Sequence, residues 1–266
     1  MPRGRTQRVL VERYGGADPG RAPDDVVVEE PLEIRLDGHL VATTMRTPGH
    51  DFELASGLCF TDGLLAGAPV VACRYCGDKG SGADTDFNIV TVESGGQAPV
   101  PTPRLGTTTS SCGLCGSTSI AELRERLHPL GGDWSFPRDI LATLPDRLGD
   151  RQELFGTTGG VHAASAVDEH GDVLIVREDI GRHNAVDKVV GRLLLDDALP
   201  ASRLALFVSG RASFEIVVKA WAAGFAAIAA VSAPSSLAVD AARSAGITLA
   251  GFVRDGRMNI YAPASQ

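Results

Sequence analysis

The sequence has no apolar run long enough to cross a membrane. Its longest apolar stretch, residues 220–231, contains Gly224 and is shorter than the roughly 20 residues that a membrane helix needs. Residues 1–16 carry arginines but no apolar segment of the kind that a signal peptide requires. We therefore expect neither a membrane span nor export, and we predict a cytoplasmic location.

An excess of positive charge is also missing. The chain has 25 Lys and Arg against 33 Asp and Glu, which gives a formal net charge of −8. General nucleic-acid binding depends on neutralising phosphates, so we do not expect nucleic acid as a partner. A local basic pocket is compatible with this balance. With 266 residues, 44% of them hydrophobic, the chain can form one large domain with a smaller companion.

Cysteine is scarce, and its arrangement excludes one class of protein. An odd number of cysteines with two C-x-x-C pairs does not fit the disulfide framework of a small secreted domain. The five cysteines are Cys59, Cys73, Cys76, Cys112 and Cys115.

The first 105 residues divide into two predicted parts. Residues 1–25 are rich in Arg, Gly, Pro and Asp with little periodicity, and we predict a flexible amino-terminal segment. Residues 26–105 are predicted to form a small β-rich domain. Apolar and polar residues alternate around the turn signal Asp37-Gly38, as in a hairpin. A Gly- and Pro-rich connector at residues 94–106 marks the boundary.

Residues 106–266 have the regular order of an α/β domain. The sequence favours helices at residues 117–127, 138–155 (interrupted at Pro145), 181–196, 213–224 and 235–246. It favours a hairpin at 161–179, buried strands at 203–210 and 225–232, and a strand-turn-strand at 248–262. Because helices alternate with buried strands, we predict a three-layer α/β fold.

Cys112 and Cys115 lie in a stretch made almost entirely of Gly, Ser and Thr. Packing as ordinary buried residues would need apolar neighbours, which this stretch lacks. Together with Cys73 and Cys76 the pair could form a four-thiolate zinc site. The interpretation as a thioredoxin-like redox pair has less support. The thioredoxin motif follows a strand, whereas this C-x-x-C pair follows a Pro-rich connector.

A fourth interpretation is a persulfide carrier. One cysteine takes a sulfane sulfur, and the second attacks the persulfide, releases the outer sulfur as sulfide and leaves a disulfide. Spacing and composition do not separate this interpretation from the redox pair.

Eight ordered motifs extend from Glu29 to Tyr261, and together they resemble the FdhD family, the sulfur-carrier accessory proteins of formate dehydrogenase. The motifs are EEPLEIRLDG, TTMRTPGHDFELASG, SSCGLCG, TGGVHAA, REDIGRHNAVDKVVG, SGRASFEIVVKAWAAG, VSAPSSLAV and TLAGFVRDGRMNIY.

The resemblance implies a cytoplasmic sulfurtransferase that matures a molybdenum cofactor. Cys112 would carry persulfide sulfur from a cysteine desulfurase to molybdenum bis(molybdopterin guanine dinucleotide), which formate dehydrogenase requires, and Cys115 would assist. A cytidine-deaminase-like α/β domain, a smaller amino-terminal β-rich domain and a homodimer are implied as well. The segment implied as the cofactor contact consists of Phe252, Val253, Arg254, Asp255, Gly256 and Arg257.

Deaminase chemistry itself is not expected. A zinc deaminase needs His-x-Glu at one helix start and Pro-Cys-x-x-Cys at the next. Here His183 is followed by Ala185 where the Glu would stand, and residues 209–213 contain no cysteine. The metal ligands and the general acid/base are both missing.

Basic residues stand in place of the zinc site. We expect Arg182, His183 and Arg211 to meet at neighbouring helix starts, where helix N-termini favour anions such as phosphate. The hypothesis is that they and the carboxy-terminal arginines bind the guanine dinucleotide phosphates, and that a guanine nucleotide such as GDP occupies the same pocket. In the alternative, Arg182 and Arg211 pair with acids such as Asp179 and Glu215 and brace the fold.

Three further interpretations complete the reading of the sequence. Cys73 and Cys76 are interpreted as ordinary residues near a turn, since four soft ligands would sequester Cys112 and Cys115 from sulfur chemistry. His162 is interpreted as a structural histidine. The rival function is a non-enzymatic chaperone that binds the molybdenum cofactor and uses its C-x-x-C pairs for structural zinc.

Overall fold

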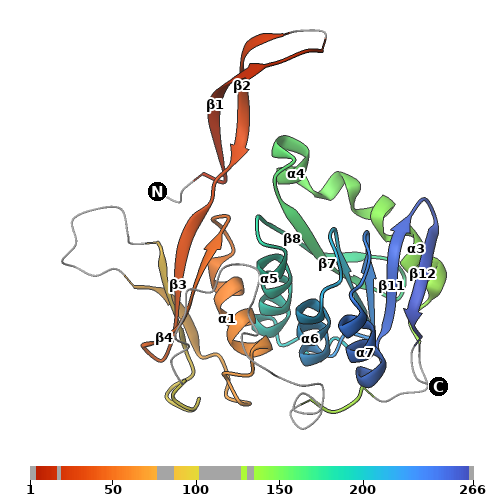
Figure 1. The fold of residues 1–266 in the computed structure, drawn as a ribbon. Helices are drawn as coiled ribbons and strands as arrows, with labels where there is room; N and C mark the ends of the chain where they lie inside the picture. Colours follow the sequence, from red (N-terminus) through yellow and green to blue (C-terminus); the bar gives the residue numbers. More distant parts are fainter. Residues whose placement is uncertain (1–3, 17–18, 77–86, 102–126, 131–134, 264–266) are drawn as a thin grey trace.

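The computed structural model describes residues 4–16, 19–76, 87–101, 127–130 and 135–263 (Figure 1). Its strands form a two-stranded ribbon, a four-stranded sheet and a six-stranded sheet. In these residues no helix combines the length and the apolar character that a membrane crossing requires.

The six-stranded sheet has the order β12-β11-β10-β9-β7-β8. Strands β9, β10 and β11 are parallel to one another, whereas β7 and β12 are antiparallel to their neighbours. The bounds are β7 (His162–Asp168), β8 (Val173–Asp179), β9 (Leu204–Val208), β10 (Ala227–Ala230), β11 (Thr248–Arg254) and β12 (Arg257–Ala262).

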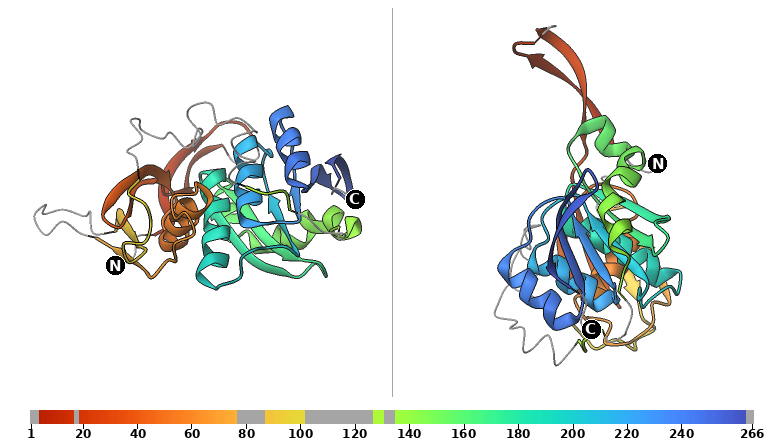
Figure 2. Two further views of the ribbon diagram at one scale, coloured as in Figure 1. Left: turned by 90° about the horizontal axis from the view of Figure 1, so that it is seen from below. Right: turned by 90° about the vertical axis from the view of Figure 1, so that its right-hand side faces the viewer.

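Helices cover both faces of this sheet. Helices α5 (Arg182–Leu195), α6 (Phe214–Ala223) and α7 (Ser236–Ala245) pack on one face, in a core that includes Leu206 and Ile228. Helix α3 (Arg138–Leu148) covers the opposite face with Phe207 and Ala229 (Figure 2). Successive residues of each buried strand therefore pack on opposite faces of the sheet, in two separate hydrophobic cores. This arrangement confirms the predicted three-layer α/β fold.

The smaller unit is a four-stranded sheet with one helix against it. Its strands are β3 (Glu30–Leu36), β4 (His39–Arg46), β5 (Ala72–Tyr75) and β6 (Ile89–Glu93), in the order β4-β3-β6-β5. Helix α1 (Asp51–Thr61) packs on it over the alternating Leu32, Ile34 and Leu36, all fully buried. The β-rich character predicted for this region is confirmed, while the predicted domain boundaries stay a prediction.

The predicted break at Pro145 is wrong. Helix α3 continues through Pro145 and ends at Leu148, and a short 3-10 turn, η1 (Gly149–Arg151), separates it from α4 (Glu153–Thr158). A proline costs a helix one hydrogen bond, but Leu141, Leu144 and Leu148 are buried against the sheet and hold the helix in place on both sides.

The amino-terminal residues also differ from the prediction. Instead of an irregular segment they form an antiparallel ribbon of β1 (Thr6–Arg13) and β2 (Gly20–Val27). Most of their side chains are exposed on both faces, so the sequence carries no alternation of apolar and polar residues. The helix predicted at residues 117–127 lies almost entirely outside the described residues.

Candidate functional site

Cys112 and Cys115, the predicted sulfur-carrying pair, lie outside the described residues. The other three cysteines are described and carry free thiols. Cys73 packs against the core of the small sheet, and burial raises the pKa of its thiol to about 11. Cys76 Sγ lies 3.2 Å from Thr91 Oγ1. No cluster of three or more metal-ligating side chains occurs in the described part of the chain. The interpretation of Cys73 and Cys76 as ordinary residues near a turn stays a prediction.

The carboxyl ends of the parallel strands bring several loops together at one edge of the six-stranded sheet. Ser232 N donates to Gly210 O over 3.4 Å, and Phe252 N donates to Ser232 O over 3.2 Å. The loop after β10 thus joins the loop after β9 to the carboxy-terminal segment. Open α/β sheets bind ligands at this edge, so the fold positions the predicted basic residues where a ligand site is expected.

His183 connects the first turns of α5 and α6. Its Nε2 lies 3.3 Å from Oγ of Ser213, the N-cap residue of α6, and 3.9 Å from a carboxylate oxygen of Glu215. The predicted meeting of two helix starts is therefore confirmed. Since His183 is almost fully buried, its side chain braces the two helices and has little surface left for a ligand.

Arg182, the first residue of α5, is partly buried at this edge. Its Nε is buried and has no hydrogen-bond partner among the described residues. A buried guanidinium nitrogen without a partner is costly, and an anionic ligand would supply the missing acceptor.

The alternative pairing with acids is not found. Within the part of the chain that the structure describes, no ion pair joins Arg182 or Arg211 to Asp179 or Glu215. Asp179 binds Lys188 instead, and Glu215 lies beside His183.

His162, which the sequence predicts to be a structural histidine, lies at this edge. Residue His162 starts β7 and pairs in register with Asp179 at the end of β8. Its ring also lies against Gly210, where an added Cβ would stand 3.4 Å from it. Burial, and then the positive charge of Arg182, lower the pKa of His162. In its neutral form the imidazole of His162 has one hydrogen-bond donor and one acceptor nitrogen, and it lies near the guanidinium of Arg182.

The carboxy-terminal segment divides into core and surface. Val253 is fully buried in the core beneath α3, so its side chain faces away from the solvent. Phe252, which has a positive φ of 52°, is 40% exposed, and the four residues from Arg254 to Arg257 are exposed at the hairpin tip. Arg257 Nη2 lies 3.7 Å from Asp255 Oδ2.

The arginines do not all meet in one contact. Arg254 and Arg257 pair in register at the end of the β11–β12 hairpin, two strands away from β9. Two strand spacings amount to roughly 10 Å. Arg211 is exposed on the loop after β9, and Arg182 lies at the start of α5. A ligand that bridged these groups would have to be extended, as a dinucleotide is.

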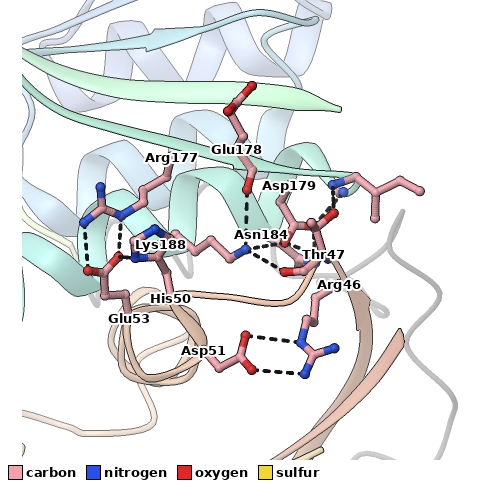
Figure 3. A network of polar contacts seen from close by, with 12 residues as sticks. Arg46, Thr47, His50, Asp51, Glu53, Arg177, Glu178, Asp179, Asn184 and Lys188 are labelled. Carbon is pink, nitrogen blue, oxygen red and sulfur yellow. Dashed lines mark hydrogen bonds and ion pairs between the residues drawn. The ribbon is translucent and has the colours of Figure 1, made fainter. Parts of the chain in front are cut away.

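A buried polar network fixes the turn before Arg182 (Figure 3). Asp179 accepts hydrogen bonds from Gly181 N at 2.8 Å and from Asn184 Nδ2 at 3.0 Å. Its other oxygen lies 2.7 Å from Lys188 Nζ, and both of these side chains are fully buried. Thr47, which follows β4, completes the network, since its N–H donates to Asp179 and its carbonyl accepts from Lys188.

This network ties the small sheet to the edge of the six-stranded sheet that carries Arg182. Asn184 Nδ2 also donates to Met45 O in β4 over 2.8 Å. Arg46, fully buried, binds Asp51 and Glu30 within the small unit. Removing one member of a buried ion pair typically costs about 3–5 kcal/mol, so the start of α5 is held in one position.

A comparison with protein-family models matches residues 27–266 to the FdhD/NarQ family. The chain belongs to the FdhD/NarQ family. The resemblance inferred from the eight motifs is thereby confirmed.

Two relatives illustrate how far the similarity extends. The sulfur carrier protein FdhD of Streptomyces avermitilis is 47% identical over 264 residues, covering 97% of this chain and 94% of its own. That of Anaeromyxobacter dehalogenans is 46% identical, covering 98% and 93%. A crystal structure described as "a putative formate dehydrogenase accessory protein" from Desulfotalea psychrophila aligns with a TM-score of 0.71 at 24% identity, covering 97% and 96%. This last match shows a shared fold.

Proposed function

We propose that this FdhD-family chain is a sulfur carrier required for formate dehydrogenase activity. The observation that carries the proposal is the similarity, over nearly the whole chain, to relatives named sulfur carrier protein FdhD. The sequence also contains a C-x-x-C thiol pair, which sulfur transfer by thiolate exchange requires. In this proposal the protein acts in the cytoplasm as a sulfurtransferase, with a cysteine desulfurase as donor.

The sulfur chemistry uses Cys112 and Cys115. The Cys112 thiolate attacks the outer sulfur of the donor's persulfide, forms a new S–S bond and displaces the donor thiolate. The Cys115 thiolate then attacks the inner sulfur, Cys112 Sγ, and the outer sulfur leaves as hydrosulfide. The two cysteines supply both electrons and end as a disulfide, which a cellular dithiol reduces before the next cycle.

The acceptor in this proposal is molybdenum bis(molybdopterin guanine dinucleotide), bound as substrate. Its phosphates would lie against Arg182, whose buried Nε lacks an acceptor, and against the exposed Arg211 on the loop after β9. Phe252 and the exposed Arg254 and Arg257 would contact a more distant part of the same extended molecule. A guanine nucleotide such as GDP would occupy part of this pocket.

Complementation tests the function as a whole. A bacterium that lacks its own FdhD-family gene is supplied with the parent chain or with a variant, and formate dehydrogenase activity is measured in extracts. The parent should restore activity and Cys112→Ala should not, while Ser117→Ala, in the same Gly- and Ser-rich stretch, should restore it. If Cys112→Ala restored full activity, the carrier mechanism would be wrong and the cofactor-binding chaperone would take its place.

A further inference from the structure

The base of the amino-terminal ribbon lies against the edge of the six-stranded sheet that carries His162 and Arg182. The ribbon of β1 and β2 rises beside α4 in the views of Figures 1 and 2. Val27, the last residue of β2, packs on Gly160, where an added Cβ would stand 3.2 Å from Val27 Cγ1. Gly160 precedes His162 by two residues. The first described residues of the chain are therefore held close to the proposed anion site.

Arg5 is fixed at this base by its backbone. Its carbonyl accepts a hydrogen bond from Val28 N over 2.9 Å, which continues the pairing of β1 with β2. Its side chain passes over Gly49, because a Cβ added to Gly49 would stand 3.8 Å from Arg5 Cδ and 4.0 Å from Arg5 Nε. Gly49 lies in the turn between β4 and α1, two residues after Thr47. The Arg5 side chain thus lies on the main body of the protein.

The guanidinium of Arg5 lacks a partner. Its Nε is buried, and among the residues that the structure describes the Arg5 side chain makes no hydrogen bond and no ion pair. In the same residues, Arg182 Nε is the only other guanidinium nitrogen that is buried and unpartnered. Arg5 as a whole is partly exposed, so a ligand can reach it. A buried donor without an acceptor is costly, and an anion would supply that acceptor.

The acids of this region are already paired with other cations. Asp179 lies 2.7 Å from Lys188 Nζ, and both Asp51 and Glu30 bind Arg46. The guanidinium that passes over the turn between β4 and α1 is therefore an additional positive charge.

Lys188 is close enough to be affected by that charge. Burial lowers the pKa of the Lys188 ammonium, and the positive charge of Arg5 lowers it further. Two cations of like sign repel each other across this turn. A bound anion would offset the repulsion as well as accept the missing hydrogen bond.

Arg5 and Arg182 are positioned by two turns that touch each other. Ile180 N donates to Thr47 Oγ1 over 3.0 Å. Gly49 follows Thr47 by two residues, and Arg182 follows Ile180 by two residues. Two residues span at most about 7 Å, so the backbones of Gly49 and Arg182 lie within roughly 20 Å of each other. The two long side chains narrow this gap to one that an extended phosphate ester can bridge.

We propose that Arg5 is a second anion-binding arginine and contacts a phosphate of the same ligand as Arg182. The inference rests on the proposed function, because the nucleotide-bearing acceptor of that proposal supplies the phosphates. The amino-terminal ribbon then contributes a side chain to the binding site.

Isothermal titration calorimetry on the full-length chain tests the contact. Arg5→Met removes the charge but keeps an unbranched side chain over Gly49, and it should raise the dissociation constant of GDP about tenfold or more. Inorganic pyrophosphate, which has phosphates and no base, should lose affinity by a similar factor. Arg13→Met, at the exposed far end of β1, is the matched control and should bind both like the parent. Weaker binding of GDP alone would overturn the assignment to a phosphate.

The stability of the ligand-free protein separates a binding role from a structural one. Because Arg5 is unpartnered and repels Lys188, Arg5→Met should leave the midpoint of urea unfolding unchanged or raise it. An arginine that only braced the ribbon would show the opposite. A variant that is less stable than the parent and binds GDP equally well would therefore contradict the inference.

The outcomes also distinguish this inference from the proposal on which it rests. Weakened GDP binding in Arg182→Gln together with parent-like binding in Arg5→Met would overturn the role of Arg5 alone. A parent chain that bound neither GDP nor pyrophosphate would overturn the role of Arg5 and the proposed cofactor pocket together. Sulfur transfer would then still be decided separately, by complementation with Cys112→Ala.

Discussion

At the scale of single residues, Arg182 has the environment that points most directly to an anionic ligand. Its Nε is buried without a partner, and the two acids that could have neutralised it are engaged elsewhere. His162 lies near enough for the charge of Arg182 to lower its pKa. Because protonation of His162 is disfavoured, the imidazole does not add a second positive charge beside the guanidinium.

Replacing Arg182 should therefore weaken the binding of a guanine nucleotide. For Arg182→Gln we expect the dissociation constant of GDP to rise about tenfold or more, since hydrogen bonds to charged groups contribute roughly 1.5–3 kcal/mol. Isothermal titration calorimetry on the parent and the variant measures this change. Arg138→Gln, at an exposed arginine on α3, is the control and should bind like the parent. An unchanged affinity in Arg182→Gln would remove this arginine from the site.

Glu53 is a second residue whose surroundings make a measurable prediction. Burial raises its pKa, but hydrogen bonds from Arg177 and His50 outweigh that effect and hold the pKa of Glu53 at about 2, against an ordinary 4.5. A lowered folded-state pKa stabilises the protein above the unfolded-state value, and this contribution is lost as the pH falls from about 4.5 toward 2. The amount at stake is roughly 3 kcal/mol.

Urea unfolding between pH 6 and pH 3 measures the contribution of ionised Glu53 to the free energy of unfolding. The free energy of unfolding of the parent should fall more steeply below about pH 5 than that of Glu53→Gln, which has no carboxylate to protonate. Other carboxylates titrate equally in both proteins, so the difference between the two curves isolates Glu53. Parallel curves would show that the ion pair with Arg177 contributes nothing to stability.

The contacts of individual residues were harder to predict from the sequence than the helices and strands. Arg182 and His183 were placed correctly at helix starts, because a buried strand followed by a glycine and an amphipathic segment defines where α5 begins. The contact of His162 with Gly210 could not be predicted, because it depends on an antiparallel register between strands far apart in the sequence. Neither residue carries a local signal of that register.

At the scale of elements, α1 and α5 cross at a contact made by two glycines. A Cβ added to Gly57 would overlap the carbonyl of Asp187, and one added to Gly191 would overlap the carbonyl of Glu53. The two helix backbones thus touch directly, which brings Glu53 of α1 within reach of Arg177 on β8. This contact sets the position of the small unit on the larger one.

Adding one methyl group at this crossing should be strongly destabilising. Gly191→Ala is expected to lower the free energy of unfolding by roughly 3 kcal/mol or more, because backbone on the facing helix cannot move aside. Thermal and urea unfolding measure the change. Gly156→Ala, in α4 with open space around it, is the matched control and should be neutral or stabilising by about 0.5–1 kcal/mol. Similar stability of the two variants would mean that the helices are not in contact at these glycines.

The elements themselves were largely predictable, and the exceptions have physical causes. Helices α5, α6 and α7 and strands β9, β10 and β11 follow their predicted ranges, because buried strands and amphipathic helices have distinct periods. The ribbon of β1 and β2 was missed because both of its faces are exposed. The continuation of α3 past Pro145 was missed because its leucine stripe outweighs one lost hydrogen bond.

At the scale of the whole molecule, the polar network joins the two units at the turn that carries Arg182. Lys188 and Asp179 of the larger unit bind Thr47 after β4, and Asn184 binds Met45 within that strand. The turn that carries Arg182 is thus fixed from both units. A turn fixed in this way would present Arg182 to an anionic ligand without reorganisation.

The central claim is that Cys112 carries a sulfane sulfur, and intact-mass analysis tests it most directly. The parent chain, Cys112→Ala and Cys115→Ala are each incubated with a cysteine desulfurase and cysteine. The intact mass of each protein is then measured by mass spectrometry under non-reducing conditions. The account predicts a gain of one sulfur atom, about 32 Da, in the parent and its loss in Cys112→Ala. No gain in the parent, with zinc bound and both thiols resistant to alkylation, would contradict sulfur transfer and leave a cofactor-binding chaperone.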